Sequence, residues 1–309
     1  MTIQNDFLPF AVGAGANVLT QSAYAALTAL GTGYQAGTAQ SAACNKTWRQ
    51  SSIMAAVISQ FIVAQTGQPA IDDGTTATLL VNFTAAVTAA AQAAAPGRLL
   101  NVQKFTSSGT YTPTPGTTTI IVEVLGGGGG GGGSAATSST QAAAGGCGAS
   151  GAYAKSRFTS GFAAGIAVTV GAAGVAGAAG SGGGTGGTTY FGSLVAAPGG
   201  TGGAGGIALA VSGGTGSGVC SAPNPPGNLV SYAGSSVMQS IIINPGVAFT
   251  AAGGSSIYGN GGIPSGVTGP GFSGSGYGAA GAGGVSLANA SAQVGGAGSQ
   301  GVAIVWEYA

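Results

Sequence analysis

An uninterrupted run of glycines, 126–133, directly follows a segment of β-branched and aliphatic residues, 117–125. The β-branched segment predicts a strand, because such side chains pack well on a pleated sheet. Glycine has no side chain to bury, and it loses more backbone entropy on ordering than any other residue. An ordered chain therefore keeps such a run only where backbones pack against one another. The alternative is a mobile segment.

The composition is rich in glycine and poor in charge. Glycine accounts for 65 of the 309 residues and charged residues for 4%, against about 7% and about 25% in average proteins. Because hydrophobic residues reach 44%, disorder caused by high charge and low hydrophobicity is excluded. The net charge is +1 and no basic run occurs, so nucleic acid and anionic membrane surfaces are poor electrostatic partners.

No segment of the sequence predicts a membrane span or a signal peptide. The apolar run 53–64 is too short and the run 76–95 is interrupted by polar residues, whereas a span needs ~20 predominantly apolar residues. Residues 1–10 lack a basic segment and include Asp6, so we expect no secretory signal. We expect a protein that is not embedded in a membrane.

The three cysteines, Cys44, Cys147 and Cys220, are far apart in the sequence. Their odd number and the lack of C-x-x-C spacing favour neither a disulfide framework nor a zinc site. We interpret them as small buried or indifferent residues, and we expect no metal and no cofactor.

Residues 1–97 are predicted to be helical. Thr20 precedes an Ala/Leu run that ends at Gly31, and the triplet 45–47 precedes a second helix that ends at Gly67. Residues of these types cap helix starts, and glycine commonly ends a helix. The segment Ala95-Pro96-Gly97 is the predicted boundary.

A third helix is predicted to begin at Thr75 or Thr76. Its apolar residues repeat at alternating spacings of three and four, which places them on one narrow seam suited to helix association. The seam comprises Leu80, Phe83, Val87, Ala90 and Ala94. It fits either a helix packed inside one monomer or a bundle of several chains.

Residues 98–309 are predicted to form β structure with glycine-rich connections. Alternating and β-branched runs predict strands at 102–106, 110–112, 117–125, 152–158, 167–170, 188–195, 237–243, 247–251 and 302–308. The last strand alternates two faces and closes the chain, so it ties down the glycine-rich region before it. The expected fold is multi-domain, with an α-helical N-terminal region followed by an all-β, sandwich-like domain with glycine-rich loops and polyglycine II-like segments.

Glycine recurs at every third residue between the predicted strands. The longest series runs from Gly171 to Gly186, and shorter ones occur at 145–151, 199–205, 278–284 and 295–301. Three residues per turn is the repeat of the polyproline II helix, and a column of glycine lets neighbouring backbones approach and hydrogen-bond to each other. Collagen is disfavoured because proline is scarce. A flexible low-complexity linker remains the alternative.

The run 126–133 differs from these series because every residue is glycine, so that no side of the segment carries side chains. We expect its half next to the strand to be buried between neighbouring backbones and its other half to loosen toward Ser134. The segment 134–144 contains only Ala, Ser, Thr and Gln and is predicted to be a mobile loop.

Catalytic chemistry has few residues available. The chain has no histidine, which removes the commonest general base and most transition-metal sites. Asp72 and Asp73 adjoin a helix start and predict local capping. Glu123 and Glu307 lie on predicted strands, and a glycosidase-type pair between them is an alternative that we do not favour.

Cations on the same predicted sheet surface are better explained as salt-bridge partners than as catalytic groups. They are Lys104, Lys155 and Arg157. We therefore expect a protein that is not an enzyme.

Aromatic residues in the uncharged region 158–306 are the remaining candidates for binding. Rigid aromatic side chains on loops offer contact area at a low entropic cost. Tyr190 and Phe191 belong to a predicted strand and are assigned to the core. The candidate receptor-binding residues are Tyr232, Tyr258, Phe272 and Tyr277.

A series of motifs follows in a distinctive order along the chain. Residues 109–113 lead into the strand 121–125 and the glycine run, and further motifs follow at 151–155, 168–171, 189–192, 199–203 and 301–308. This order resembles that of bacteriophage tail fibre and adhesin proteins with a glycine-rich C-terminal domain. Residues 7–19 and 45–50 also resemble the attachment end of such fibres.

The resemblance implies a virion protein located in the tail fibre, most simply a homotrimer. Its N-terminal part, 1–97, would serve as attachment and trimerisation region and bind tail or baseplate proteins. The glycine-rich β domain, 98–309, would bind a host bacterial surface receptor, either an outer-membrane protein or a glycan. In related adhesins, glycine-rich segments pack as polyglycine helices and the loops between them contact the receptor.

Two other classes of protein stay open. A tail-spike enzyme that degrades surface polysaccharide is one, and the lack of histidine and the scarcity of acids in the distal half argue against it. A purely structural Gly/Ala-rich surface protein shares the composition but not the order of strands and glycine series.

Overall fold

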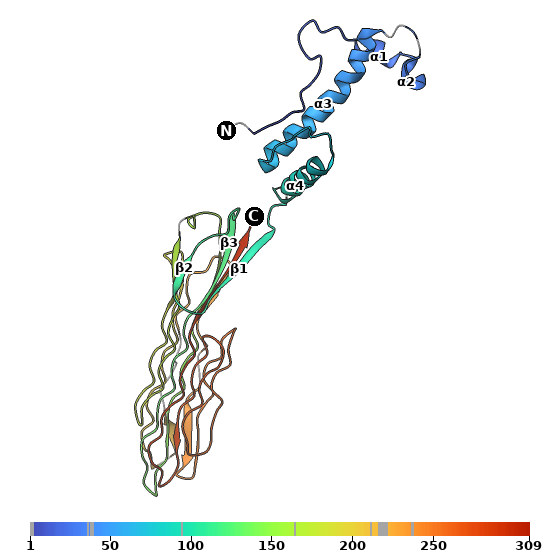
Figure 1. The fold of residues 1–309 in the computed structure, drawn as a ribbon. Coiled ribbons are helices and arrows are strands. Elements are labelled where there is room, and N and C mark those ends of the chain that lie inside the picture. Colours follow the sequence, from blue (N-terminus) through green and yellow to red (C-terminus); the bar gives the residue numbers. More distant parts are fainter. Residues whose placement is uncertain are drawn as a thin grey trace. The chain divides into compact units, whose positions relative to one another are not determined.

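The computed structural model describes residues 3–35, 37, 40–93, 95–163, 165–210, 212–215, 222–235 and 238–309. Mostly β-strands and a few helices make up the described chain (Figure 1). Two compact units divide it, Met1–Pro96 and Gly97–Ala309. Among the described residues, no helix is long and apolar enough to cross a membrane. Ala94 and Cys220 lie outside the described residues.

The first unit contains α1 (Gln21–Ala25), α2 (Ala29–Thr32), α3 (Ser41–Thr66) and α4 (Ala77–Ala93). Thr20 caps α1, since its hydroxyl accepts a hydrogen bond of 3.2 Å from the Ala23 amide. The single helix predicted after Thr20 is thus two short helices. Helix α3 begins before the predicted triplet 45–47, and the Asn45 side chain donates to the Asn17 carbonyl instead of capping. As predicted, α3 ends at Gly67, which has a φ of 64°.

Helices α3 and α4 pack against each other through few buried side chains. The rings of Phe61 and Phe83 meet edge to face with their centroids 6.4 Å apart, and Ala86 is the only buried residue in α4. Most large apolar side chains of the two helices are exposed instead: Trp48, Ile53, Met54, Val57, Ile58, Leu80, Val81, Phe83 and Val87. The predicted seam of α4 therefore leaves Leu80 and Val87 open within one chain.

Two antiparallel sheets form one end of the second unit. The first has the order β1 (Leu99–Phe105), β14 (Val302–Tyr308), β3 (Thr119–Leu125), β5 (Tyr153–Phe158) and β10 (Val230–Tyr232). The second has the order β2 (Gly109–Tyr111), β6 (Ile166–Thr169), β7 (Thr189–Phe191) and β8 (Val195–Ala197). Their inward side chains form the main core, in which Tyr111, Val122 and Phe191 are fully buried.

The alternation predicted for the last strand is confirmed. In β14, Ala303, Val305 and Glu307 are buried, whereas Ile304 and Trp306 are partly exposed. One prediction about the core is wrong: Phe191 is buried but Tyr190 is 45% exposed. The predicted strand 188–195 is interrupted because Gly192, with a φ of 52°, turns the chain between β7 and β8.

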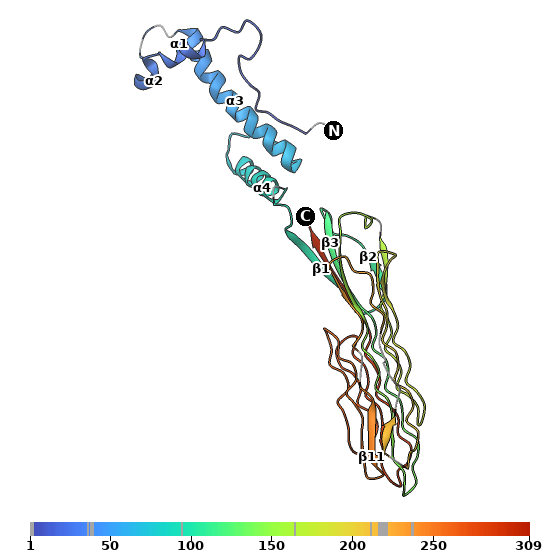
Figure 2. The same cartoon turned by 180° about the vertical axis from the view of Figure 1, so that it is seen from behind.

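Two small sheets lie at the other end of the second unit. They pair β12 (Val247–Phe249), β11 (Ser240–Asn244) and β9 (Gly213–Thr215), and β13 (Val285–Ser286) with β4 (Ala143–Ala144). Figure 2 shows β11 far from β1 and β3. A second core gathers here, with Ile242 and Val285 buried and Leu209 and Leu287 packed against them. Between the two ends, extended segments run side by side (Figure 1).

The glycine run 126–133 is the centre of these extended segments. Each of its amides donates a hydrogen bond of 2.8–3.0 Å, and the acceptors lie on three segments that the run meets in rotation. The acceptor carbonyls are those of Ala152, Ala149 and Gly146 on the first segment, Gly187, Gly184 and Ser181 on the second, and Ser299 and Gly296 on the third. Because the acceptor numbers fall as the donor numbers rise, these three segments run antiparallel to it.

Three further segments donate to the carbonyls of the run. Their amides are those of Gly200, Gly203 and Gly206, of Gly174 and Gly177, and of Gly281 and Gly284. Donor and acceptor numbers rise together here, so these segments run parallel to it. The run therefore has six hydrogen-bonded neighbours, three antiparallel and three parallel.

The whole run is buried, so the prediction that its second half loosens toward Ser134 is wrong. A Cβ atom placed on any glycine of the run would lie 1.9–2.1 Å from a backbone carbonyl oxygen of a neighbouring segment. A segment with neighbours on every side cannot carry a side chain in any direction. Unlike the series with glycine at every third residue, the run has glycine at every position. That difference suggested a loose segment, but it reflects the central position of the run.

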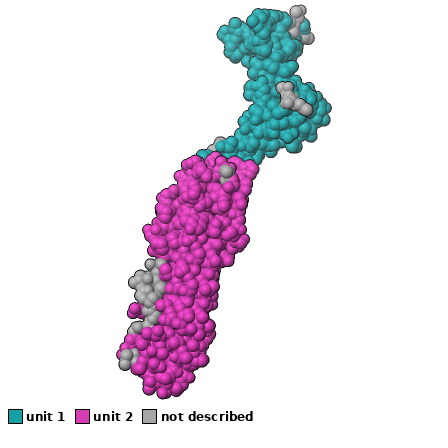
Figure 3. Space-filling view, turned by 90° about the vertical axis from the view of Figure 1, so that its left-hand side faces the viewer, with its two compact units in different colours: residues 1–96 teal, residues 97–309 magenta. Residues whose placement is uncertain are grey.

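The prediction of a mobile loop at 134–144 is also wrong. The Ser134 hydroxyl bonds the Ser286 hydroxyl at 2.8 Å, and the amides of Ala135 and Ala142 donate to Gly206 and Leu209. Both ends of the segment thus join the packed region, and only a short turn around 138–141 connects them. Figure 3 draws this unit in magenta.

Candidate functional site

Three of the four candidate aromatics come together on the outer face of the five-stranded sheet. Tyr232 lies on β10 directly opposite Tyr153 of β5, and the two rings stack with centroids 5.1 Å apart. Tyr258 meets the edge of the Tyr153 ring at 6.5 Å, and Tyr277 packs into the same cluster. Phe272 is not part of it and is 48% exposed.

Glu123 of β3 lies at the centre of this cluster. Its carboxylate accepts hydrogen bonds from the hydroxyls of Tyr153, at 3.0 Å, and Tyr258, and forms a 3.0 Å ion pair with the Lys155 ammonium. Glu123 is only 5% exposed. Because all these partners donate, the carboxylate is held ionised and joins the segment around Tyr258 to the sheet.

Burial and hydrogen bonding act in opposite directions on the pKa of Glu123. Burial by itself would raise the pKa of Glu123, but hydrogen bonds from Tyr258, Lys155 and Tyr153 outweigh it and hold the pKa below its usual value. Burial and the nearby carboxylate raise the pKa values of Tyr153 and Tyr258. The two hydroxyls therefore stay protonated donors.

The prediction that cations on this sheet surface form salt bridges is confirmed for Lys155. Lys104 instead lies over the ring of Tyr277, with its ammonium 4.5 Å from the ring centre. Tyr153, which was not among the predicted receptor-binding residues, connects the cluster. The sequence did contain a signal for it, because Tyr153, Lys155 and Arg157 alternate along one predicted strand and therefore share one face of the sheet.

The two carboxylates of the sheet do not form a pair. Glu307 is opposite Ile120 and Glu123 is opposite Ile304. Their positions along β3 therefore differ by three, an odd offset, and the two side chains point to opposite faces. Glu307 is fully buried and accepts hydrogen bonds from Tyr111 (2.7 Å), Gln103 (3.1 Å) and both the amide and hydroxyl of Thr114. Its role is to hold the turn after β2.

Other chemically capable residues have local roles. Asp72 and Asp73 accept hydrogen bonds from Gly74 and Thr75 in the turn before α4. Cys147 is buried and its thiol donates to the Ala251 carbonyl. No group of three or more metal-ligating side chains occurs among the residues that the structure describes.

The end of the second unit that lies beyond Ser134 is built from joined turns. The Thr137 amide donates to Ala290, and the Asn289 amide donates to Ser138. The turn between β11 and β12 joins them through a 2.8 Å bond from the Ala288 amide to the Pro245 carbonyl. We call the turns 135–141, 244–246 and 287–292 the tip.

Exposed apolar side chains accompany the tip. Ile241 and Phe249 lie opposite each other on β11 and β12 and are each 49% exposed, Ile243 is 53% exposed and Ile207 is 63% exposed. No residue from 158 to 306 is charged. The tip can therefore offer backbone groups, hydroxyls and apolar contacts, but no charge.

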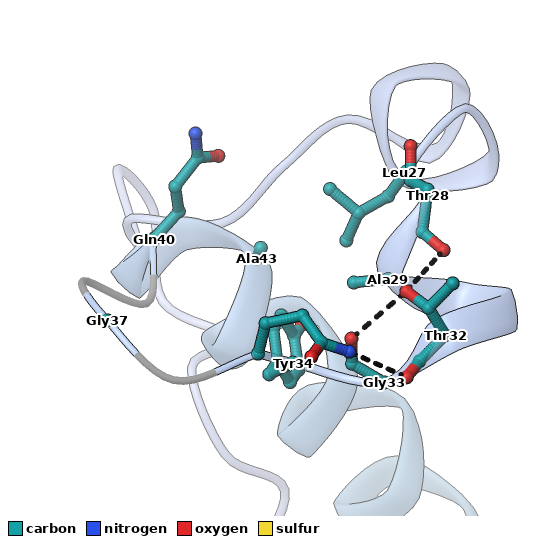
Figure 4. A pocket seen from close by; sticks show the side chains of 10 residues that line it. Leu27, Thr28, Ala29, Thr32, Gly33, Tyr34, Gly37, Gln40 and Ala43 are labelled. Carbon is teal, nitrogen blue, oxygen red and sulfur yellow. Dashed lines mark hydrogen bonds between the residues drawn. The ribbon is translucent and has the colours of Figure 1, made fainter.

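A pocket of about 360 Å³ lies in the first unit between α2 and the start of α3 (Figure 4). Leu27, Thr28 and Ala29 line one side and Gln40 and Ala43 another. Its polar contacts are internal, such as the bond of 3.2 Å from the Thr32 hydroxyl to the Thr28 carbonyl. The pocket carries no ionisable cluster.

No family model matches the chain, and no curated protein matches it either.

Proposed function

We propose that this chain is a bacteriophage tail fibre protein that binds a host surface receptor through the tip of its glycine-rich unit. The observation that carries the proposal is the glycine run 126–133, hydrogen-bonded to six neighbouring segments. Such a centre fixes the surrounding segments without a conventional hydrophobic core. It presents the tip turns on a rigid support, as binding loops require.

The extended segments are best described as polyglycine II helices packed around a common centre. Hydrogen bonds recur at every third residue and join different segments rather than residues of one segment. A left-handed helix with three residues per turn and no internal hydrogen bonds has this pattern. Such a bundle supports the proposed adhesin architecture.

The chemistry of the tip favours recognition without charge. Its exposed apolar residues and turn backbones lie in a region that has no ionisable side chain. Salt screens interactions between exposed charges, so host adsorption through the tip will vary little with ionic strength. A steep loss, between low and high salt, of the part of adsorption that substitutions at the tip abolish would contradict this mode of binding.

The helical unit is the proposed attachment and trimerisation region. Its two long helices leave a set of large apolar side chains exposed, and contiguous exposed apolar patches of this kind mark protein interfaces. Copies of the chain and tail or baseplate proteins are the proposed partners. In this proposal the protein has no enzymatic role.

Point substitutions at the tip test the proposed function. Deletion of 219–276 is less suitable, because Gly254 and Gly262 in that range bond to Gly148 and Ala280 inside the bundle. Ile243→Lys and Ile207→Lys place a charge on exposed positions beside the tip, and Val175→Lys is the matched control because Val175 is 71% exposed beside the packed run.

Purified variants compete with intact phage for adsorption to host cells in this experiment. We expect Ile243→Lys and Ile207→Lys each to compete at least about tenfold less effectively than the unchanged chain, which corresponds to about 1.4 kcal/mol of binding free energy. The Val175→Lys protein should compete as the unchanged chain does. Equal competition by all variants, with folding retained, would contradict binding through the tip.

A further inference from the structure

One strip on the outer face of the five-stranded sheet combines an open aromatic ring with cations. Tyr153, Lys155 and Arg157 alternate along β5 and share that face, and Tyr232 on β10 stacks on Tyr153. Tyr232 is 40% exposed, the Lys155 side chain is 34% exposed and Arg157 is exposed. We call Tyr232, Lys155 and Arg157 the β5–β10 strip.

The charge of this strip is unusual for the unit that carries it. Arg157 and Lys155 lie two residues apart, which places their Cα atoms about 7 Å apart along the strand. Three cations, Lys104, Lys155 and Arg157, share this sheet face with the single carboxylate of Glu123. An excess of positive charge therefore remains after Glu123 pairs with Lys155.

The ring of Tyr232 is held in place from one side. Tyr153 lies under it at an interplanar angle of 26°, and the Tyr153 hydroxyl is itself fixed by Glu123. A ring supported in this way offers its other face to a ligand with little loss of side-chain entropy. The flat apolar face of a sugar ring is a suitable partner, and the ammonium and guanidinium farther along β5 suit carboxylates or phosphates of the same oligosaccharide.

We propose that the β5–β10 strip binds an acidic oligosaccharide, with one sugar ring on Tyr232 and the anionic groups of the oligosaccharide at Lys155 and Arg157. This inference rests on the proposed function in host recognition and adds a second, charged contact away from the tip. The two contacts differ in chemistry, because the tip is uncharged. Binding at the strip weakens as salt rises, since its cations are exposed.

Isothermal titration calorimetry of the full chain with trigalacturonic acid tests the proposal, with the neutral galactose trisaccharide as the comparison ligand. The acidic trisaccharide should bind and the neutral one should bind at least about tenfold more weakly. Tyr232→Ala and Arg157→Gln should each weaken binding about tenfold, as stacking and charge contacts of this kind do when truncated. Lys155 is left unchanged because Glu123 depends on it.

Tyr190→Ala and Arg98→Gln are the matched controls. Tyr190 is 45% exposed on the other sheet and Arg98 is exposed outside the strip, so both variants should bind as the unchanged chain does. No binding of the acidic trisaccharide, equal loss in the controls, or tighter binding of an oligothymidylate would overturn the proposal. Ile243→Lys should leave calorimetric binding intact, so failure at the strip is distinguishable from failure of receptor binding at the tip.

Discussion

The central glycines have a role that no other residue can take. Gly129 donates to the Ala149 carbonyl and accepts from the Gly281 amide, while a Cβ atom on it would lie 2.1 Å from the Thr201 carbonyl oxygen. The chain cannot relieve that contact locally, because both hydrogen bonds fix the Gly129 backbone. The entropic cost of ordering glycine is offset here by backbone hydrogen bonds on every side.

Gly129→Ala will destabilise the glycine-rich unit by about 3 kcal/mol or more, the upper range for overpacking a close-packed interior. Trp306 reports this unfolding by fluorescence once Trp48, the other tryptophan, is replaced by Phe. Gly269→Ala is the control, because a Cβ atom there meets nothing within 4 Å, and it should change stability by less than about 0.5 kcal/mol. Similar urea midpoints for the two variants would refute the packed centre.

Tyr258→Phe removes one donor from the buried Glu123 carboxylate and leaves the ring in place. Hydrogen bonds to charged groups contribute about 1.5–3 kcal/mol, so the variant should lose about 2 kcal/mol by the same fluorescence measurement. Tyr190→Phe, at an exposed position, should change stability little. If both variants unfold alike, Tyr258 does not hold its segment to the sheet.

At the scale of elements, the sequence was informative where side chains carry the pattern. The alternation in β14 and the glycine end of α3 were predictable, since period-two burial and glycine caps are local signals. The position of the glycine run was not, because bare backbone looks the same whether it is mobile or surrounded. The cluster around Glu123 was only partly predictable, since β10 brings Tyr232 to Tyr153 from far along the sequence.

The ionisable residues of the sheets predict that the stability of the glycine-rich unit is constant over a middle range of pH and falls at lower and at higher pH. The pKa values of Glu123 and Glu307 are lowered, since hydrogen bonds outweigh burial, so their contribution is present above the unfolded value of about 4.3 and is lost as pH falls below it. The pKa values of Tyr111, Tyr153 and Tyr258 are raised, mainly by burial. Their contribution is present below about 10 and is lost as pH rises further.

Urea midpoints followed through Trp306 should therefore be level between about pH 5.5 and pH 9 and fall on both sides. Glu307→Gln should reduce the acid-side fall, because one of the two titrating carboxylates is removed. A midpoint that changes steadily through the plateau would show that other groups control the pH dependence.

At the scale of the whole molecule, the two units bury apolar surface in different ways. The glycine-rich unit closes its interior with backbone hydrogen bonds and three clusters of buried side chains. The helical unit buries little beyond Tyr24, Ile62 and a few small residues. Since helices in water depend on packing of an apolar face, this exposed surface supports the proposal that the helical unit packs against a partner, such as another copy of the chain.

Leu80 and Val87 lie seven residues apart on the predicted seam of α4 and are 63% and 47% exposed. Leu80→Lys with Val87→Lys should shift the chain from an oligomer to its monomer mass of 28.6 kDa in light scattering after size-exclusion chromatography, because charges oppose burial at an interface. Ala85→Lys with Gln92→Lys has the same spacing and charge on the opposite, exposed side of α4 and should keep the oligomer. A monomeric unchanged chain, or dissociation of both double variants, would rule out the seam as the association surface.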